Sequence, residues 1–431
     1  MAINLLYKPG LNIKMILDDQ KQINIFLCND ILNIILNFLS LVDIYSVKLL
    51  NKYYGEYIDT RFILKIYYHS GANKKIIQKY GKYLKKIIIY SKKNKIDYNT
   101  TYDDYFIGCD NLETLDTNLN LTDMALKYIP NIRNLVLNGI YNITDEGLKY
   151  IPNIENLTIP CNCQITDEGL KYIPNVISLN LYSNNCVTDE GLKYLYNIKY
   201  INLGSNHHIT NQGLKYIPSI INLDLRYNNN ITDDGLKYIL NVTSLNLHHN
   251  KNMIGRGLNY IPNVTSLDLH NNTTISDNDL KYIPNIEYLD LYQNNCVTDK
   301  GLKYIPNVTN LILYNNKYIT DRGLKYIPNI VTLELYFNEN ITDEGLKYIP
   351  NIKNLNLNQN KNITDNGLKY IPSIQNLDLY KNNKITDEGL KYITNIKKLY
   401  LGSNKKITEE GLNYIPHIKK FKDFYSHCFN Y

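Results

Sequence analysis

The sequence predicts an α/β solenoid (horseshoe) of about fourteen repeats, preceded by a small all-helical module. The motif Gly-Leu-Lys-Tyr recurs at intervals of 22 residues or a multiple of 22, and degenerate copies keep this frame from Ala125 to Gly411, which makes fourteen units. Each unit joins a short strand pattern to a short helix pattern, whereas residues 22–68 have helical periodicity. A fixed period of this length indicates stacked supersecondary units that bury one continuous core.

Composition excludes several other classes of protein. The 431 residues are 44% apolar and 20% charged, which is compatible with a large core and excludes a disordered or collagen-like chain. The net charge of +6 is too small to indicate a nucleic-acid binder along the whole length. No apolar run approaches the roughly 18 residues of a membrane span. Seven scattered cysteines and the absence of a secretion signal favour a reduced, cytoplasmic or nuclear protein.

The unit from Gly345 to Asn366 shows how the strand half of a repeat is built. Ile352, Leu355 and Leu357 are spaced so that Leu355 and Leu357 lie on one face of a short strand, which neighbouring units must cover. Asn360 follows where the strand ends, and its amide can pair with backbone groups of adjacent turns. The same asparagine recurs at Asn184, Asn206, Asn228, Asn250, Asn272, Asn294, Asn316, Asn338, Asn382 and Asn404.

The other half of the unit has the pattern of a short helix. Thr342 is placed to cap the helix, and Leu346 and Ile349 face the core. Pro350 then ends the helix after about two turns. A lysine follows the leucine of each helix, as at Lys149, and we expect these lysines to form a solvated outer face in preference to a polyanion site.

The pattern L-x-x-L-x-L-x-x-N followed by I-T-D-x-G-L resembles leucine-rich repeats of the cysteine-containing subfamily, with Asn in place of Cys. The resemblance covers residues 125–420 in fourteen in-frame copies. It implies a curved solenoid with strands on its concave face. That subfamily usually has a longer unit, so the shorter period predicts a tighter turn.

A different pattern precedes the repeats. After an N-terminal extension (residues 1–21), residues 22–68 predict a packed helical module, in which Asn29 or Asp30 caps the first helix. The apolar positions of its three expected helices are Ile31, Ile34, Ile35, Phe38 and Leu39, then Ile44, Val47 and Leu50, then Tyr54, Tyr57 and Ile58.

The run L-C-N-D-I-L-N-I-I-L-N-F-L-S-L-V-D-I at residues 27–44 resembles an F-box, and the agreement continues to Tyr53. Cys28 stands where that family usually has Pro, and Tyr53 or Tyr54 where it often has Trp. The resemblance implies a substrate-recognition adaptor of an SCF-type ubiquitin ligase, whose F-box binds a Skp-type linker subunit and through it a cullin. By position, the linker-binding residues are Leu27, Cys28, Ile31, Ile35 and Leu39. The alternative is a three-helix cap on the solenoid.

Two further segments flank the repeats. Residues 69–124 are expected to be a linker with irregular first repeats around Leu84, Ile87 and Ile89. Their lysines could bind an anionic partner or nucleic acid, but a solvated helix face is the preferred interpretation. Residues 421–431 are rich in aromatic residues and predict a C-terminal cap. Abundant Ile, Asn, Lys and Tyr suggests an AT-rich protist or a large DNA virus, in which case the linker subunit would come from the host cell.

The concave face is the predicted binding site for a target protein. Stacked strands turn one repeat position into a row, and the row after the second leucine is aromatic or basic, with a carboxylate row beside it. The alternative is that the tyrosines of this row reflect only the high tyrosine content of the sequence. The residues of the two rows are Asp224, Arg226, His248, Asp268, His270, Asp290, Tyr292, Tyr314, Glu334, Tyr336, Asp378 and Tyr380.

Catalysis, metal and cofactors are not predicted. His248, His270 and Asp268 are placed to be neighbours, so a divalent metal is geometrically conceivable, but no further ligand or supporting shell is evident from the sequence. We therefore expect no metal and no cofactor. No phosphate loop, nucleophile elbow or H-E-x-x-H motif occurs, so we do not expect an enzyme. Besides the adaptor, a binding scaffold with no ubiquitin role and a decoy that occupies the linker subunit are alternatives.

Overall fold

The computed structural model describes residues 63–66, 71–89, 100–138, 142–162, 164–400, 402, 404, 406–416 and 418. The chain divides into two units, Met1–Arg61 and Phe62–Tyr431, and every described residue belongs to the second. The predicted linker-binding residues and the predicted C-terminal cap, residues 421–431, lie outside the described residues. Among the described residues, no helix is long and apolar enough to cross a membrane.

The second unit is a solenoid whose described strands form one sixteen-stranded parallel sheet in sequence order. Equivalent residues of neighbouring turns are paired, so that Leu289 lies opposite both Leu267 and Leu311. The 22-residue period of the sequence is therefore the repeat of the structure. The strands are β1 (Ile63–Ile66), β2 (Lys86–Ile89), β3 (Thr114–Thr117), β4 (Asn134–Leu137), β5 (Asn156–Thr158), β6 (Ser178–Asn180), β7 (Tyr200–Asn202), β8 (Asn222–Asp224), β9 (Ser244–Asn246), β10 (Ser266–Asp268), β11 (Tyr288–Asp290), β12 (Asn310–Ile312), β13 (Thr332–Glu334), β14 (Asn354–Asn356), β15 (Asn376–Asp378) and β16 (Lys398–Tyr400).

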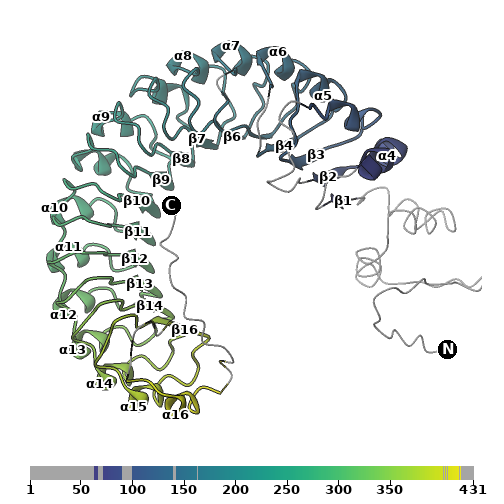
Figure 1. Ribbon diagram of the computed structural model, residues 1–431. Helices are drawn as coiled ribbons and strands as arrows, with labels where there is room; N and C mark the ends of the chain where they lie inside the picture. The colour runs from purple at the N-terminus through teal and green to yellow at the C-terminus, as the bar shows by residue number, and fades with distance from the viewer. Residues whose placement is uncertain are drawn as a thin grey trace, which may run out of the picture. The chain divides into compact units, whose positions relative to one another are not determined.

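Within this unit, the strands line the concave side and the helices the convex side (Figure 1). Each of the fourteen predicted repeats contributes one short helical element. The helices are α4 (Gly71–Tyr80), α5 (Asp123–Lys127), α6 (Asp145–Leu148), α7 (Asp167–Leu170), α8 (Asp189–Leu192), α9 (Asp233–Leu236), α10 (Asp277–Leu280), α11 (Asp299–Leu302), α12 (Asp321–Leu324), α13 (Asp343–Leu346), α14 (Asp365–Leu368), α15 (Asp387–Leu390) and α16 (Glu409–Leu412), with 3₁₀ elements η1 (Gly81–Tyr83), η2 (Asp103–Phe106), η3 (Gly213–Tyr216) and η4 (Arg256–Tyr260).

The helices are shorter than the two turns that the sequence predicted. Helix α13 has four residues, and beyond it Ile349 N–H donates to the Leu346 carbonyl three residues back, while Ile352 N–H donates likewise to Ile349. Turns of this type rise about 2.0 Å per residue against 1.5 Å in an α-helix. Successive tight turns therefore cross the convex side with fewer residues, which suits a 22-residue unit.

The irregular segment before the repeats already belongs to the sheet. Leu84, Ile87 and Ile89 are fully buried, as expected for a first irregular repeat, and Lys75 of α4 is exposed. Strand β1 differs from the expectation, because residues 63–66 fell within the segment predicted to be helical (22–68) yet pair with β2. The sheet therefore begins before the expected linker.

The recurring asparagine after each strand links the backbone of its own turn to the backbone of the preceding turn. Asn316 is fully buried, and its Nδ2 donates to the carbonyls of Asn294 (2.8 Å) and Val297 (3.1 Å) in the preceding turn. Its Oδ1 accepts from the backbone N–H groups of Tyr318 (2.9 Å) and Ile319 (3.0 Å). One side chain thus satisfies four backbone groups that are removed from water.

A second set of contacts between turns joins an aspartate to the threonine that caps the next helix. Asp321 accepts from Thr342 N–H (2.8 Å) and from its hydroxyl (2.6 Å), while the same hydroxyl accepts from Glu344 N–H (3.3 Å). A Cβ atom on Gly345 would collide with the Asp321 carboxylate. The recurring Thr-Asp-x-Gly pattern of this chain thus records a contact between turns as well as a helix cap.

One pair of turns exchanges these two residue types. Gly255 occupies the aspartate position, with φ at +92°, and Asp279 occupies the glycine position of the next turn. Asp279 accepts from Ser276 N–H (2.8 Å) and from its hydroxyl (2.7 Å), and so replaces the missing contact from the preceding turn. A Cβ atom on Gly255 would lie 2.5 Å from the Asp279 carboxyl carbon. Only one carboxylate fits between these two turns.

We predict that Asn316→Ala lowers the free energy of unfolding by about 3 kcal/mol, because several buried backbone groups lose their partner. Asn366→Ala, at an exposed helical position, is the matched control and should change it by less than about 0.5 kcal/mol. Urea unfolding of the full chain measures both. Equal stability of the two variants would contradict the account.

We also predict that Gly255→Asp and Asp279→Gly compensate each other. Each single variant should cost about 1–3 kcal/mol, the first by a collision and the second by leaving Ser276 N–H without an acceptor. The loss of unfolding free energy in the double variant should be smaller than the sum of the two single losses by at least about 1 kcal/mol. A double-mutant cycle by urea unfolding measures the coupling, and strictly additive costs would refute it.

Candidate interaction surface on the concave face

The carboxylates of the concave face first serve the strand ends. Asp224, Asp268, Asp290 and Asp378 each accept, through Oδ1, the backbone N–H two residues further on, at 2.8–3.0 Å. Asparagines make the same bond in other turns, as Asn246 does with His248 N–H (2.9 Å). Asp224 and Asp290 are only 8% and 6% exposed. The acidic row predicted from the sequence is therefore largely engaged within the protein.

Arg226 is also paired internally. Its Nε donates to both Asp224 carboxylate oxygens, at 3.0 and 2.8 Å, and its guanidinium carbon lies 5.9 Å from the centre of the Tyr182 ring. Side-chain hydrogen bonding to Asp224 raises the pKa of Arg226 despite partial burial. Arg226 therefore lies at one end of the aromatic row, and its charge is already paired with that of Asp224.

Five of the predicted residues form a continuous row of rings, which we call the aromatic ladder. Its members, from successive turns, are His248, His270, Tyr292, Tyr314 and Tyr336, all half-buried. Neighbouring ring centres are 4.1, 4.1, 5.3 and 5.4 Å apart along this series. Strands of a sheet are about 4.8 Å apart, so equivalent side chains of adjacent turns are in ring-contact range.

Two of the three tyrosine hydroxyls of the ladder, those of Tyr314 and Tyr336, are held by polar neighbours. Tyr314 donates to Glu334 Oε2 at 2.8 Å, and Gln359 Nε2 donates to the Tyr336 hydroxyl at 3.0 Å. Tyr380 is not part of the ladder, because Asn358 occupies the intervening turn. Its ring lies instead 5.2 Å from the Lys381 ammonium group. The Tyr314 and Tyr336 rings are thus positioned before any partner arrives, which lowers the entropy cost of binding.

Three rings beside the ladder were missed by sequence reasoning. Tyr227, His249 and Phe337 have φ angles near +58°, as does each residue that precedes a buried asparagine from Cys161 to Lys381. Tyr227 stacks on His249 (4.9 Å between ring centres), and Phe337 lies 4.1 Å from Tyr336. The fixed offset from the asparagine was the available signal, but the left-handed backbone that turns these side chains toward the ladder is not visible in the residue types.

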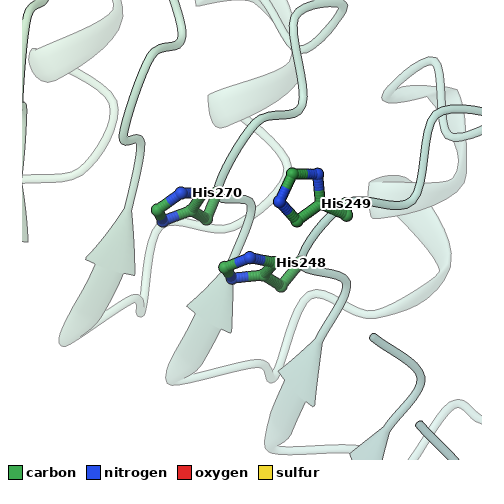
Figure 2. Close-up of side chains that lie close together, drawn as sticks. All are labelled: His248, His249 and His270. Carbon is green, nitrogen blue, oxygen red and sulfur yellow. The ribbon is translucent and has the colours of Figure 1, made fainter. Parts of the chain in front are cut away.

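At one end of the ladder three histidine side chains, those of His248, His249 and His270, lie close together (Figure 2). His248 Nδ1 lies 3.7 Å from Asp268 Oδ2, and His270 Nδ1 lies 3.7 Å from Asp290 Oδ2. Burial raises the pKa of Asp268, but hydrogen bonds from His248 and the His270 backbone outweigh it and leave that pKa below its usual range. Burial and the neighbouring His248 and His270 lower the pKa of His249.

Comparison with known proteins supports the repeat architecture. The family described as Leucine Rich repeat matches residues 174–195, 197–217, 218–240, 282–305, 326–349, 348–371 and 372–394. These segments are leucine-rich repeats, and solenoids of this kind present extended concave surfaces for binding. No curated protein matches the sequence of this chain.

Solved structures share the fold at low identity. A leucine-rich-repeat protein of Leptospira interrogans is 20% identical, with a TM-score of 0.55 over 78% of this chain and 89% of its own. Toll, in the Toll–Spatzle complex of Drosophila, is 15% identical, with a TM-score of 0.52 over 74% and 47%. TLR13, in its complex with ssRNA13, is 17% identical, with a TM-score of 0.50. The match to TLR13 covers 73% of this chain and 57% of that one, and at these identities the likeness concerns the fold alone.

Folding shifts the pKa values of the concave-face carboxyls in different directions, and the shift at Asp378 gives a prediction. Burial raises the pKa of this carboxyl more than hydrogen bonds from Tyr380 N–H and Asn358 lower it. An acid whose pKa is raised by folding loses stability as pH rises above its unfolded value, about 3.8. Asp378→Asn, which keeps the acceptor as Asn246 and Asn356 do, should therefore raise the urea midpoint at pH 7.

The gain in Asp378→Asn should shrink as the pH is lowered and vanish well below pH 3.8, where the wild-type carboxyl is protonated in both states. Asp378→Ala is the control that removes the acceptor, and it should be less stable than wild type at both pH values. A loss of stability in Asp378→Asn at pH 7 would contradict the assignment.

Proposed function

We propose that this chain, which folds as a solenoid of leucine-rich repeats, binds a target protein through the aromatic ladder of its concave face. The observation that carries the proposal is the continuity of the ladder over five turns, with the exposed rings of Tyr227 and Phe337 beside its two ends. Pre-positioned aromatic side chains with a polar rim are typical of the residues that dominate protein–protein interfaces. Because the concave-face carboxylates are hydrogen-bonded within the protein, we expect a partner surface with both apolar and polar groups instead of a strongly basic one.

A protein partner is favoured over a nucleic acid. The solved relatives include one complex with RNA and one with a protein, so the fold does not select between them. Asp268, Asp290 and Glu334 lie directly beside the rings of this chain. Carboxylates at these positions would repel a phosphate backbone, whereas nucleic-acid sites are lined with Lys and Arg.

We further propose that the protein is a substrate-recognition adaptor of an SCF-type ubiquitin ligase. The support is the F-box-like sequence at residues 27–44, with Leu27, Cys28, Ile31, Ile35 and Leu39 as the contacts of a Skp-type linker. The linker would bring a cullin and its enzyme partner close to the protein held on the ladder, so that proximity alone directs ubiquitin transfer. By sequence, we assign the repeats to the cysteine-containing subfamily with Asn in the Cys position.

The test of the adaptor role is a pull-down from eukaryotic lysate with full-length baits. Ile31→Asp with Ile35→Asp should abolish recovery of the Skp-type linker and cullin by mass spectrometry, because charge would enter an apolar docking face. Asn33→Asp with Asn37→Asp adds the same charge at polar positions of the same predicted helix, and should leave recovery unchanged. Failure of the wild-type chain to recover the linker would overturn the adaptor role and leave a scaffold.

The ladder is tested with the same baits in a separate arm. Tyr292→Ser with Tyr314→Ser should remove the target protein while the linker is still recovered. Tyr304→Ser with Tyr326→Ser makes the same chemical change at positions next to convex-side lysines and should have no effect. Recovery of the linker with no ladder-dependent protein would favour a decoy over a receptor.

A further inference from the structure

The ladder brings together three imidazoles from two adjacent turns. His248 and His270 follow the ends of β9 and β10 and stack with ring centres 4.1 Å apart, and His249 lies beside them at the left-handed position (Figure 2). One ring nitrogen from each of the three lies within 4.8 Å of the others. The sequence offered only two of these histidines as neighbours, because the direction of His249 depends on its positive φ.

We propose that His248, His249 and His270 form a binding site for a divalent cation of the zinc type. Zn²⁺ binds imidazole nitrogens at about 2.0–2.1 Å in a tetrahedron, which places ligand nitrogens roughly 3.4 Å apart. The three ring nitrogens lie within 4.8 Å of one another, and binding of the ion requires the rings to close to that spacing by rotation about their terminal torsions, which are broad for histidine. The backbone need not move, because each ring comes from a separate, fixed position at a strand end.

Two of the proposed ligands, His248 and His270, each have a carboxylate next to the ring. Asp268 and Asp290 each place a carboxylate oxygen 3.7 Å from the Nδ1 atom of His248 and His270 respectively. A carboxylate near Nδ1 favours the tautomer that carries its proton on that atom, so that Nε2 is the nitrogen whose lone pair faces a metal. Both carboxylates are held in turn by backbone N–H groups, at 2.9 and 2.8 Å. This is the supporting shell that the sequence alone did not reveal.

The third ligand is also positioned by its surroundings. Asn271 Nδ2, from the next turn, lies 2.9 Å from His249 Nε2 and orients this ring. The side chains of His248 and His270 are each only 13% exposed, so little water must be removed when an ion binds. Three imidazoles select Zn²⁺, Ni²⁺ or Cu²⁺ over Mg²⁺ or Ca²⁺, which prefer oxygen. Three protein ligands leave one tetrahedral position for water.

The test is calorimetric titration of untagged full-length protein with ZnCl₂. Substitutions can be taken from other turns of the same chain, which keeps the fold intact: His248→Tyr and His270→Tyr as at Tyr292, and His249→Asn as at Asn271, which has φ of +59°. Each should weaken Zn²⁺ binding at this site at least tenfold. His207→Asn with His208→Asn, a pair of exposed histidines outside the site, is the matched control and should bind as wild type does.

A second variant tests the supporting shell without touching a ligand. Asp290→Asn should weaken Zn²⁺ binding by about 10–100-fold, whereas Asp378→Asn, at the equivalent strand position of a distant turn, should not. Zn²⁺ binding that is absent from wild type, or unchanged by His249→Asn and by Asp290→Asn, would overturn the proposal. The titration contains no partner protein, so its outcome is independent of the adaptor role.

Discussion

The buried asparagine after each strand is the interaction on which the solenoid depends. In each 22-residue turn the helix and the tight turns pair their backbone groups within the turn, whereas the strand and the chain beside it pair with the turns on either side. The parallel ladder satisfies the strand, and the asparagine amide satisfies the chain where the strand ends, as Asn316 does for four groups at once. Every turn must therefore present its strand end in the same orientation, which fixes the register of all that follows.

The concave surface is a consequence of that constraint. Because each asparagine must point into the core, the residue before it adopts a left-handed backbone in turn after turn. Such a conformation costs about 1–2 kcal/mol for a residue other than glycine. At His249 and Phe337 it adds a second ring beside the ladder position, and so doubles the aromatic side chains that one turn can present. Stability of the core and chemistry of the surface are coupled at this one residue.

The sequence predicted those features that one repeat unit contains in full. The period, the buried Leu355 and Leu357, the capping threonine and the asparagine bonds all follow from spacing within a unit. Among the contacts that join different units, the asparagine bonds were predicted, but the contact of Asp321 with Thr342 of the next turn was not. Helix length was overestimated because tight turns and α-helix share apolar spacing over a few residues.

The candidate site divides in the same way. Rows of equivalent residues are predictable, so His248 to Tyr336 were expected to lie side by side, and they do. The hydrogen bond from Arg226 to Asp224 and the direction of the His249 side chain depend on local backbone geometry, which residue types do not reveal.

The central claim, that the ladder is where a protein binds, is tested most directly by site-specific photo-crosslinking. A photoreactive phenylalanine analogue is placed at Tyr314 on the concave face or at Tyr326, beside a lysine of the convex side, in otherwise wild-type full-length chains. The account predicts that irradiation in lysate attaches a specific protein at Tyr314 and none at Tyr326. Crosslinks to a specific protein from Tyr326 alone would contradict it.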